Sequence, residues 1–545
     1  MMSIQQKGDN GLVRFFKWLW QGLERTIFVG IKFTYPSRFV SPMGFLGMLT
    51  FITFIILGIT GALLMFYYEP ILDRAWDSVK TINNTIPYGF HIRNIHYHAS
   101  NAMVFLALAH MYYQYFSGRY KIRNEVLWVT GVILGTVTIL EAFTGYDIIY
   151  NERAELAISI ASSLTNSIPV IGPELREIVF GAGFADFVLR FYALHVFILP
   201  IVMLGLMAVH FPRFLVFDVP MVMAVAGMIF IVAGVFPVEL GNKFDPTVPP
   251  DITVPEWYLS GIYAFLRTQY DKFVTGVLWP GLFIAALAMI PFIDRYKKLS
   301  WKDRPLITAI GITSLAQIIV TTYWGFYIDP DFNKPLLDRI VIDPILFYTV
   351  MLLLVPLSFG FTYMMIKLAK HFEELNKKEA AARKAKGTTG LNISIKWGWW
   401  LLAVLLAFQV YLNIAAYYAG INGFKNVQLF IIGLVLVTFA GVFHLYRYLN
   451  EQVKKAKPIA KPAPKEPTPR PVIEHKEKEI KPVVEAKVQA STTIDTIGKT
   501  TATAATTAVE ATTTTVTTAT SPPSPPPPSS SSPSSTSGST SSNPG

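Results

Sequence analysis

Apolar residues fall in ten blocks along this sequence, separated by stretches rich in charged residues, glycine and proline. The blocks are roughly 20 residues long, which is the length that a helix needs to cross a hydrocarbon core. A block inside lipid must be helical, because a helix satisfies its own backbone hydrogen bonds. The predicted spans are residues 43–67, 99–117, 126–147, 190–211, 219–238, 274–293, 306–326, 342–368, 397–419 and 427–448. We therefore predict an all-α polytopic membrane protein.

Lysine and arginine gather in alternate connections between these spans. They are frequent before residue 43, at 119–123, at 295–304 and at 367–386, whereas the opposite loops are balanced or acidic. Because cytoplasmic loops carry the excess of basic residues, we expect a multi-pass protein of the plasma membrane with both termini in the cytoplasm. The net charge of +11 is explained in this way without a nucleic-acid partner.

The sequence contains no cysteine. This excludes disulfides, thiolate metal sites and iron–sulfur clusters held by the chain, and haem attached through a Cys-x-x-Cys-His motif. Histidine is then the obvious ligand for any metal that the chain holds.

Four histidines form two matched pairs on the second and fourth predicted spans. His96 and His110 are 14 residues apart, and His195 and His210 are 15 apart. On a helix, 14 residues correspond to nearly four turns and a rise of about 21 Å, so each pair lies close to one face at two depths. Two such helices side by side would form two bis-histidine cages of the kind that bind haem iron. The alternative is that these histidines are polar residues satisfied within a helix bundle.

Glycines repeat the same spacing on the first and third spans. Gly47 and Gly61 are 14 residues apart, and so are Gly131 and Gly145. A haem macrocycle lying against a helix requires residues without a side chain at those two depths. Close packing between helices also favours small residues, but the match to the histidine spacing favours haem contact.

Several short motifs accompany the paired histidines and glycines. They are Ile92-Arg93, Ile168-Pro169-Val170-Ile171-Gly172, Arg190-Phe191-Tyr192 and Pro255-Glu256-Trp257-Tyr258. With these residues the chain resembles the cytochrome b family of quinol-oxidising bc-type complexes, from about residue 40 to residue 368. The 15-residue spacing of His195 and His210 is similar to the chloroplast branch of that family.

The resemblance implies a cofactor role for the paired residues. His96 and His195 would hold a haem nearer the outer face, and His110 and His210 would hold a second haem nearer the inner face. Arg93 would neutralise a haem propionate. Two b-type haems are expected, with a modified a-type as the alternative.

The resemblance also implies a quinol site and partner proteins. Glu256 would accept a proton from quinol at the outer face, Tyr146 and Tyr258 would line that pocket, and Pro255 and Trp257 would contact the quinone. One electron would pass to a separate Rieske-type iron–sulfur protein, and the other would cross the membrane through the two haems, coupled to proton translocation. The family is usually dimeric, so a homodimer is expected. The spans at 397–419 and 427–448 lie outside the resemblance and are candidates for docking a further respiratory subunit, such as a terminal oxidase.

Some features of the outer region depart from the family pattern. Gly145-Tyr146 is usually followed by a Leu-Pro-Trp turn, whereas Asp147-Ile148-Ile149-Tyr150 stands here, and the next helix carries Glu152, Arg153 and Glu155 where apolar residues are usual. Glu141, an acid inside the third span, is a candidate for proton exit beside the outer site.

The inner quinone site is only weakly marked in the sequence. Arg213 and Asp218, which lie just after His210, are the candidate residues for it.

These observations divide the chain into six segments. They are a cytoplasmic N-terminal segment (1–42), a four-helix di-haem core (43–215), further helices with the outer-site motif (216–368), a charged linker (369–396), two additional spans (397–448) and a tail (449–545). The tail is rich in Lys and Pro and then in Thr, Ser and Pro, so we expect it to be disordered.

Two other classes of protein would share parts of this pattern. A di-haem membrane anchor of a peripheral dehydrogenase would need the histidines but not Pro255-Glu256-Trp257-Tyr258. A transporter would have about ten spans, but it would show discontinuous helices and often an internal repeat, and it would not need four matched histidines.

Overall fold

A helix occupies each of the ten predicted spans in the computed structural model. The model describes residues 11–24, 30–34, 42–122, 125–181, 186–211, 214–248, 252–386 and 394–456. The ten helices are α2 (Leu46–Met65), α4 (Gly89–Ser117), α5 (Glu125–Asp147), the continuous α8 (Phe187–Ala193), η3 (Leu194–Ile198) and α9 (Leu199–His210), α10 (Val219–Val235), α12 (Trp279–Ile293), α13 (Pro305–Phe326), α15 (Pro344–Lys386), α16 (Ile395–Ile421) and α17 (Lys425–Ala456).

Eight of these helices are long and apolar enough to cross a membrane. The other two are α4, which is 29 residues long but carries the polar side chains of its histidine-rich first half, and α10, which is apolar but has 17 residues. The expectation of a polytopic helical membrane protein is confirmed.

Shorter elements connect the spans. They are α1 (Gly11–Glu24), η1 (Pro42–Phe45), α3 (Ala75–Asn84), η2 (Arg119–Lys121), α6 (Glu152–Asn166), α7 (Gly172–Phe180), α11 (Trp257–Leu266), η4 (Val274–Leu278), η5 (Trp301–Asp303) and α14 (Leu336–Ile340). The prediction of an entirely helical fold missed one feature, a two-stranded parallel sheet of β1 (Gly30–Thr34) and β2 (Phe214–Asp218). Strand β2 begins shortly after the helix that ends at His210.

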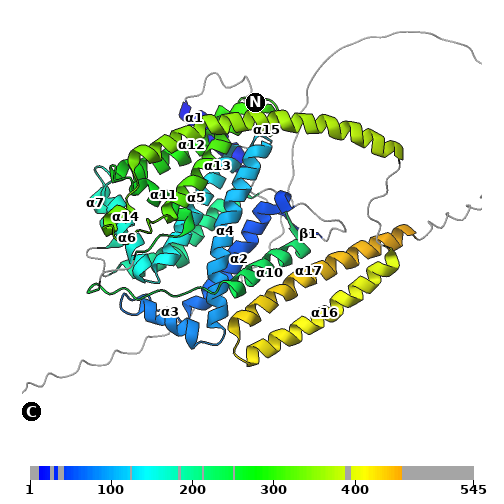
Figure 1. The fold of residues 1–545 in the computed structure, drawn as a ribbon, viewed down its shortest axis with the longest axis horizontal. Helices are drawn as coiled ribbons and strands as arrows, with labels where there is room; N and C mark the ends of the chain where they lie inside the picture. The colour runs from blue at the N-terminus through cyan, green and yellow to red at the C-terminus, as the bar shows by residue number, and fades with distance from the viewer. Residues whose placement is uncertain are drawn as a thin grey trace, which may run out of the picture. The chain divides into compact units, whose positions relative to one another are not determined.

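The first four spans form a helix bundle. Helix α2 packs against α4 (Figure 1), α4 packs against α5, and α5 packs against α9. At the centre of this bundle, Met103, Met203 and Met207 are almost completely buried. The bundle thus has a packed apolar middle between the two depths at which its histidines lie.

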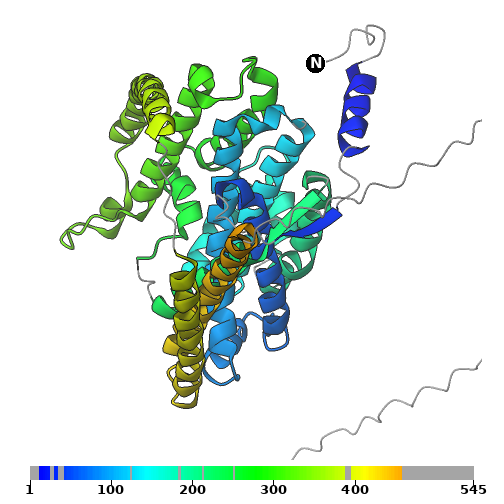
Figure 2. The ribbon, with the colours of Figure 1, turned by 90° about the vertical axis from the view of Figure 1, so that its right-hand side faces the viewer.

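The later helices pack in two groups. Helix α13 packs against α11 and α15, and α12 packs against α5 of the bundle. Helices α16 and α17 form an antiparallel hairpin, and α17 lies along α10 (Figures 1 and 2). Gly227 and Gly234 of α10 and Gly433 of α17 allow the two backbones to come close, because a Cβ atom at each would lie 2.7 Å or less from the other helix's backbone.

Two predicted boundaries shift in the structure. The expected linker 369–396 is helical up to Lys386, because α15 continues without a break through its charged residues. Helix α17 likewise extends to Ala456, beyond the predicted start of the tail at 449. The remainder of the predicted tail, residues 457–545, lies outside the described residues.

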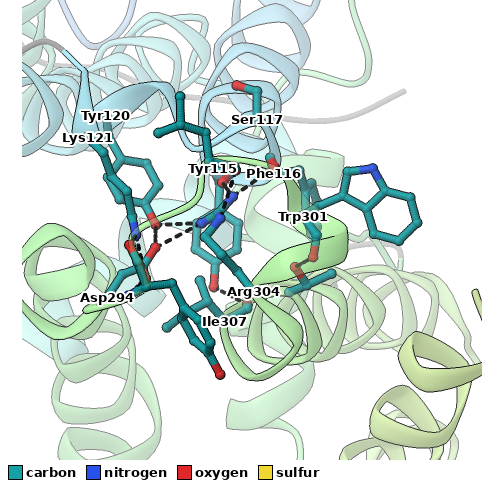
Figure 3. Close-up of polar contacts among 12 residues, drawn as sticks. Tyr115, Phe116, Ser117, Tyr120, Lys121, Asp294, Trp301, Arg304 and Ile307 are labelled. Atoms are coloured by element: carbon teal, nitrogen blue, oxygen red, sulfur yellow. Dashed lines mark hydrogen bonds and ion pairs between the residues drawn. The ribbon is translucent and has the colours of Figure 1, made fainter. Parts of the chain in front are cut away.

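A buried polar network joins the loop after α4 to the start of α13 (Figure 3). The Asp294 carboxylate accepts hydrogen bonds from Lys121 at 2.7 Å, from Arg304 at 3.0 Å and from the Tyr120 hydroxyl. Arg304 also donates to the backbone carbonyls of Tyr115 and Phe116 at 2.9 and 2.8 Å. Burial opposes ionisation of Asp294, but these donors outweigh burial and hold its carboxyl pKa below the ordinary value.

Candidate functional site

The four paired histidines meet as two cages inside the bundle. The ring centroids of His96 and His195 are 6.2 Å apart with an interplanar angle of 81°, and those of His110 and His210 are 6.2 Å apart at 88°. An imidazole nitrogen binds a metal at about 2 Å, and the ring centroid lies roughly 1 Å behind that nitrogen. Two axial imidazoles on one iron would therefore have centroids about 6 Å apart, so each cage fits a bis-histidine haem.

The donor set of the cages also fits haem. Among the residues that the structure describes, no three His, Asp or Glu side chains gather in a group that could hold a bare metal ion. Two imidazoles on opposite sides suit a metal that brings its own equatorial ligands, as haem iron does.

A wide helical turn sets the register of the second histidine helix. Residues Leu194–Ile198, which include His195, form one turn of π-helix within an otherwise α-helical span. On a regular α-helix, 15 residues turn about 60° beyond four full turns, which would rotate His195 away from His210. The π-turn accommodates one additional residue, so the 15-residue spacing acts as a 14-residue spacing and matches that of His96 and His110.

Hydrogen bonds at Nδ1 orient three of the four imidazoles. His195 Nδ1 lies 3.0 Å from the Glu141 carbonyl, and His210 Nδ1 lies 2.8 Å from the Leu127 carbonyl. His96 Nδ1 lies 2.9 Å from the Thr60 hydroxyl. When Nδ1 carries the proton and donates it, Nε2 keeps its lone pair for a metal.

The four repeated glycines face the imidazoles. A Cβ atom on Gly47 would lie 2.9 Å from the His110 ring, and one on Gly61 would lie 3.1 Å from the His96 ring. At Gly131 and Gly145 the distances to His210 and His195 are 2.6 and 2.4 Å. Glycine is therefore required for the approach of α2 and α5 to the histidine rings themselves, a contact that the sequence-based argument had assigned to the haem plane.

A cavity of about 1300 Å³ begins at the inner cage. Its lining includes His110 and His210, and it extends to Pro255, Trp257 and Tyr258 of the outer-site motif. Most of the lining is apolar, which suits a macrocycle and a lipid-soluble substrate.

The outer-site motif places a buried carboxylate beside two donors. Glu256 is 5% exposed and precedes the first residue of α11. Its Oε1 accepts a hydrogen bond from Arg153 Nη1 at 2.8 Å, and Tyr97 donates to Oε1 and Oε2 at 3.2 and 3.3 Å. Trp257 is anchored by its indole N–H, which donates to Asn101 at 2.7 Å.

Tyr146 and Tyr258 belong to the same group of side chains. The Tyr146 ring lies under the Arg153 guanidinium at 5.6 Å, and Tyr258 interacts electrostatically with Glu256 and Asp147. Asp147 is fully buried, and neither of its carboxylate oxygens has a hydrogen-bond partner in the described structure. The predicted outer-site residues are thus brought together.

Other predicted site residues have different surroundings. Arg93 donates to the backbone carbonyls of Val238 and Glu239 at 2.9 and 3.0 Å, so its role toward a haem propionate stays a prediction. Glu141 lies against the haem-ligand candidate His195, with Oε1 3.3 Å from Nδ1. The proton-exit hypothesis for Glu141 gains no support from this position.

The two inner-site candidates are only partly visible. Arg213 lies outside the described residues. Asp218, the last residue of β2, is 4% exposed and interacts electrostatically with His444 of α17. Burial raises the pKa of the Asp218 carboxyl, and His444 opposes that rise.

Two family models and several known proteins are similar to this chain. The family described as "Cytochrome b/b6/petB" matches residues 31–217, and that described as "Cytochrome b(C-terminal)/b6/petD" matches residues 243–337. Cytochrome b6 of Heliobacterium modesticaldum is 37% identical over 178 residues, which are 32% of this chain and 84% of that protein. The cytochrome b subunit of the cytochrome bc complex of Chlorobaculum thiosulfatiphilum is 28% identical over 331 residues, covering 53% of this chain and 74% of that protein.

A chain in a solved structure of a hyperthermophilic respiratory Complex III is also similar to this one. The TM-score is 0.48 at 21% sequence identity, and the match covers 66% of this chain and 97% of that chain.

Proposed function

This chain belongs to the cytochrome b family, and we propose that it is the subunit of a respiratory complex that oxidises quinol at an outer site. The observation that carries the proposal is the pair of matched imidazole cages, each with ring centroids 6.2 Å apart. Helix α4, which supplies one histidine to each cage, also contacts Glu256. Tyr97, which follows His96 directly in sequence, donates to Glu256.

His96 with His195, and His110 with His210, would each hold one b-type haem. Haem bound in the two cages supplies one-electron carriers at two depths of the membrane. The chain's own contribution is to fix the imidazoles through Nδ1 hydrogen bonds and to admit the rings through the four glycines. The bundle separates the cages with its packed methionine centre.

Glu256 would take the proton from a quinol hydroxyl as general base. In that step the quinol O–H bond would break and a Glu256 O–H bond would form. A Rieske-type iron–sulfur partner and the haems held by the four histidines would be the acceptors of the electrons. A general base must lie within hydrogen-bond reach of its proton, and the anchoring of Trp257 by Asn101 fixes the motif that presents Glu256.

The surroundings of such a subunit follow from the same proposal. We expect other respiratory subunits, a homodimer, proton translocation coupled to quinol oxidation, and a plasma membrane with both chain termini in the cytoplasm. The lysine and arginine residues of the connections at 119–123 and 295–304 support that orientation.

Redox spectroscopy tests the cages. A reduced-minus-oxidised spectrum of the purified protein, titrated stepwise, should show two haem waves. His96→Ala should remove one wave and His110→Ala the other. No haem signal, or a single wave that neither substitution changes, would show that the cages do not bind haem.

Quinol oxidation by the intact complex tests the outer site. Glu256→Gln should lower the rate by about 100-fold or more, the usual contribution of a general base, with both haem waves retained. An unchanged rate in this variant would remove Glu256 from the mechanism.

A further inference from the structure

Arg153 of the surface helix α6 is held in a fixed place by three contacts. Its Nε donates to the Val254 carbonyl at 2.6 Å and its Nη1 donates to Glu256 Oε1 at 2.8 Å. Its guanidinium also lies over the Tyr146 ring, 5.6 Å from the ring centre. One planar side chain therefore binds both the Val254 carbonyl and the Glu256 carboxylate. A guanidinium can do this because its donors form a rigid fork.

The burial of this ion pair distinguishes it from the surface pairs of the chain. The side chains of Arg153 and Glu256 are 33% and 7% exposed, whereas those of Lys243 and Asp77, which are 2.7 Å apart, are 45% and 56% exposed. A buried carboxylate without a partner is costly, so Arg153, together with the Tyr97 hydroxyl, stabilises Glu256 in this position. The Arg153 side chain itself remains partly exposed.

The two oxygens of Glu256 are not equivalent. Within the part of the chain that the structure describes, Oε1 accepts from both Arg153 and Tyr97, whereas Oε2 accepts from Tyr97 alone, at 3.3 Å. A carboxylate oxygen can accept more than one hydrogen bond, and Oε2 is the less occupied of the two. The arrangement leaves Oε2 as the oxygen that can receive a hydrogen bond from a substrate hydroxyl.

We propose that Arg153 is a positioning residue for quinol oxidation: it holds Oε1 of Glu256 and leaves Oε2 to accept the quinol proton. The role rests on the proposed function. The proton moves from the quinol oxygen to Oε2, and the electrons leave as in the proposed function. Arg153 itself exchanges neither protons nor electrons.

The charged and titratable groups that interact with Glu256 come from three elements besides its own. Tyr97 comes from α4, Tyr146 from the end of α5 and Arg153 from α6, and Tyr258 follows on α11. Arg153 is the only cation among these four groups, so its replacement by Gln leaves Glu256 without a counter-charge among them.

The test compares kcat and KM of quinol oxidation by the intact complex carrying Arg153→Gln, Arg153→Lys or no substitution. Arg153→Gln should lower kcat about tenfold with little change in KM, because Glu256 then lacks the donor that fixes Oε1. Arg153→Lys keeps a cation but not the fork, so it should give an intermediate kcat. Arg74→Gln, at an exposed pair just before α3, is the matched control and should keep the native kcat and KM.

A double variant separates positioning from structure. In a Glu256→Gln background, Arg153→Gln should cause no further loss, because Arg153 acts through Glu256. Both haem waves should persist in every variant; if Arg153→Gln fails to assemble, Arg153→Lys carries the test through its intermediate rate.

The outcomes distinguish the two proposals. A native complex that oxidises no quinol would overturn the proposed function, and the role of Arg153 with it. An active native complex whose Arg153→Gln variant has the native kcat and KM would overturn the role of Arg153 alone. A further loss in the double variant would show that Arg153 acts by a route other than Glu256.

Discussion

Gly145 faces the imidazole of His195 so closely that a Cβ atom there would lie 2.4 Å from the ring carbon Cε1. Gly145→Ala should therefore displace the ring, at a cost of about 1–3 kcal/mol for overpacking, and weaken haem binding in the outer cage by tenfold or more. The measurement is a redox titration of the purified protein, in which the outer haem wave should shrink and the inner one persist.

Gly205 of α9 provides the control for this prediction. No other element comes within 4 Å of the position where its Cβ would be, so Gly205→Ala should keep both waves and gain slightly in helix propensity. Equal spectra for the two alanine variants would show that Gly145 is not needed for the approach to His195.

Thr60 of α2 connects His96 of α4 to the backbone of α2. Its hydroxyl donates to the Ile56 carbonyl at 2.7 Å and lies 2.9 Å from His96 Nδ1, so its oxygen can accept a hydrogen bond from the Nδ1–H group. Thr60→Val should weaken haem binding at His96 by about 10–100-fold, the usual effect of losing a ligand's hydrogen-bond partner, and shift the potential of that haem alone.

Thr50→Val tests whether this effect depends on the histidine. Thr50 is on the same helix, and its hydroxyl donates a hydrogen bond to the Leu46 carbonyl at 2.9 Å. The two haem waves should be native in this variant. A similar shift in both threonine variants would point to a general disturbance of α2 instead.

Gly433 of α17 lies against α10, with a Cβ position 2.6 Å from the Ile231 nitrogen and 2.7 Å from the Gly227 oxygen. Both neighbours are backbone atoms that cannot rotate away, so Gly433→Ala should separate the helices. If the chain is expressed as two pieces divided within residues 387–393, the piece with α16 and α17 should co-purify with the first piece, and Gly433→Ala should reduce this recovery several-fold. Gly441→Ala, in open space on the same helix, should not change it.

Helix positions and the four ligand candidates could be predicted from the sequence because they depend on local periodicity. Apolar blocks predict nine of the ten helices, whereas α4 is interrupted by polar side chains and is indicated by the spacing of His96 and His110 on one face. The 15-residue spacing of His195 and His210 is visible in the sequence, but its physical basis, the π-turn at Leu194–Ile198, is visible only in the backbone.

The partners of the site residues could not be predicted, because they are distant in sequence. Arg153 and Glu256 are 103 residues apart, and Tyr97 and Glu256 are 159 apart. The sequence showed Arg153 only as a charge where apolar residues are usual. The sheet of β1 and β2 was missed for the same reason, since its two strands are separated by four helical spans.

Asp294 and Arg304 form an ion pair whose side chains are both 0% exposed. Breaking a buried pair leaves an uncompensated charge, which costs about 3–5 kcal/mol. Asp294→Asn should therefore lower the free energy of unfolding by about that amount at neutral pH. The measurement is thermal or denaturant unfolding of the detergent-solubilised protein, with Asp303→Asn as control, because the Asp303–Lys298 pair is largely exposed at 3.4 Å and should contribute less than about 1 kcal/mol.

The stabilisation by Asp294 should also depend on pH in a stated direction. Burial opposes its ionisation, but Lys121, Tyr120 and Arg304 together hold its carboxyl pKa below the ordinary value of 3.8. A carboxyl group with a lowered pKa in the folded state stabilises the fold fully above its unfolded pKa, and this contribution falls as the pH drops through the folded value. The difference in unfolding free energy between the native protein and Asp294→Asn should thus be constant from pH 7 to about pH 5 and shrink below pH 4. A difference that instead grew with acid would mean that Asp294 is protonated in the native network.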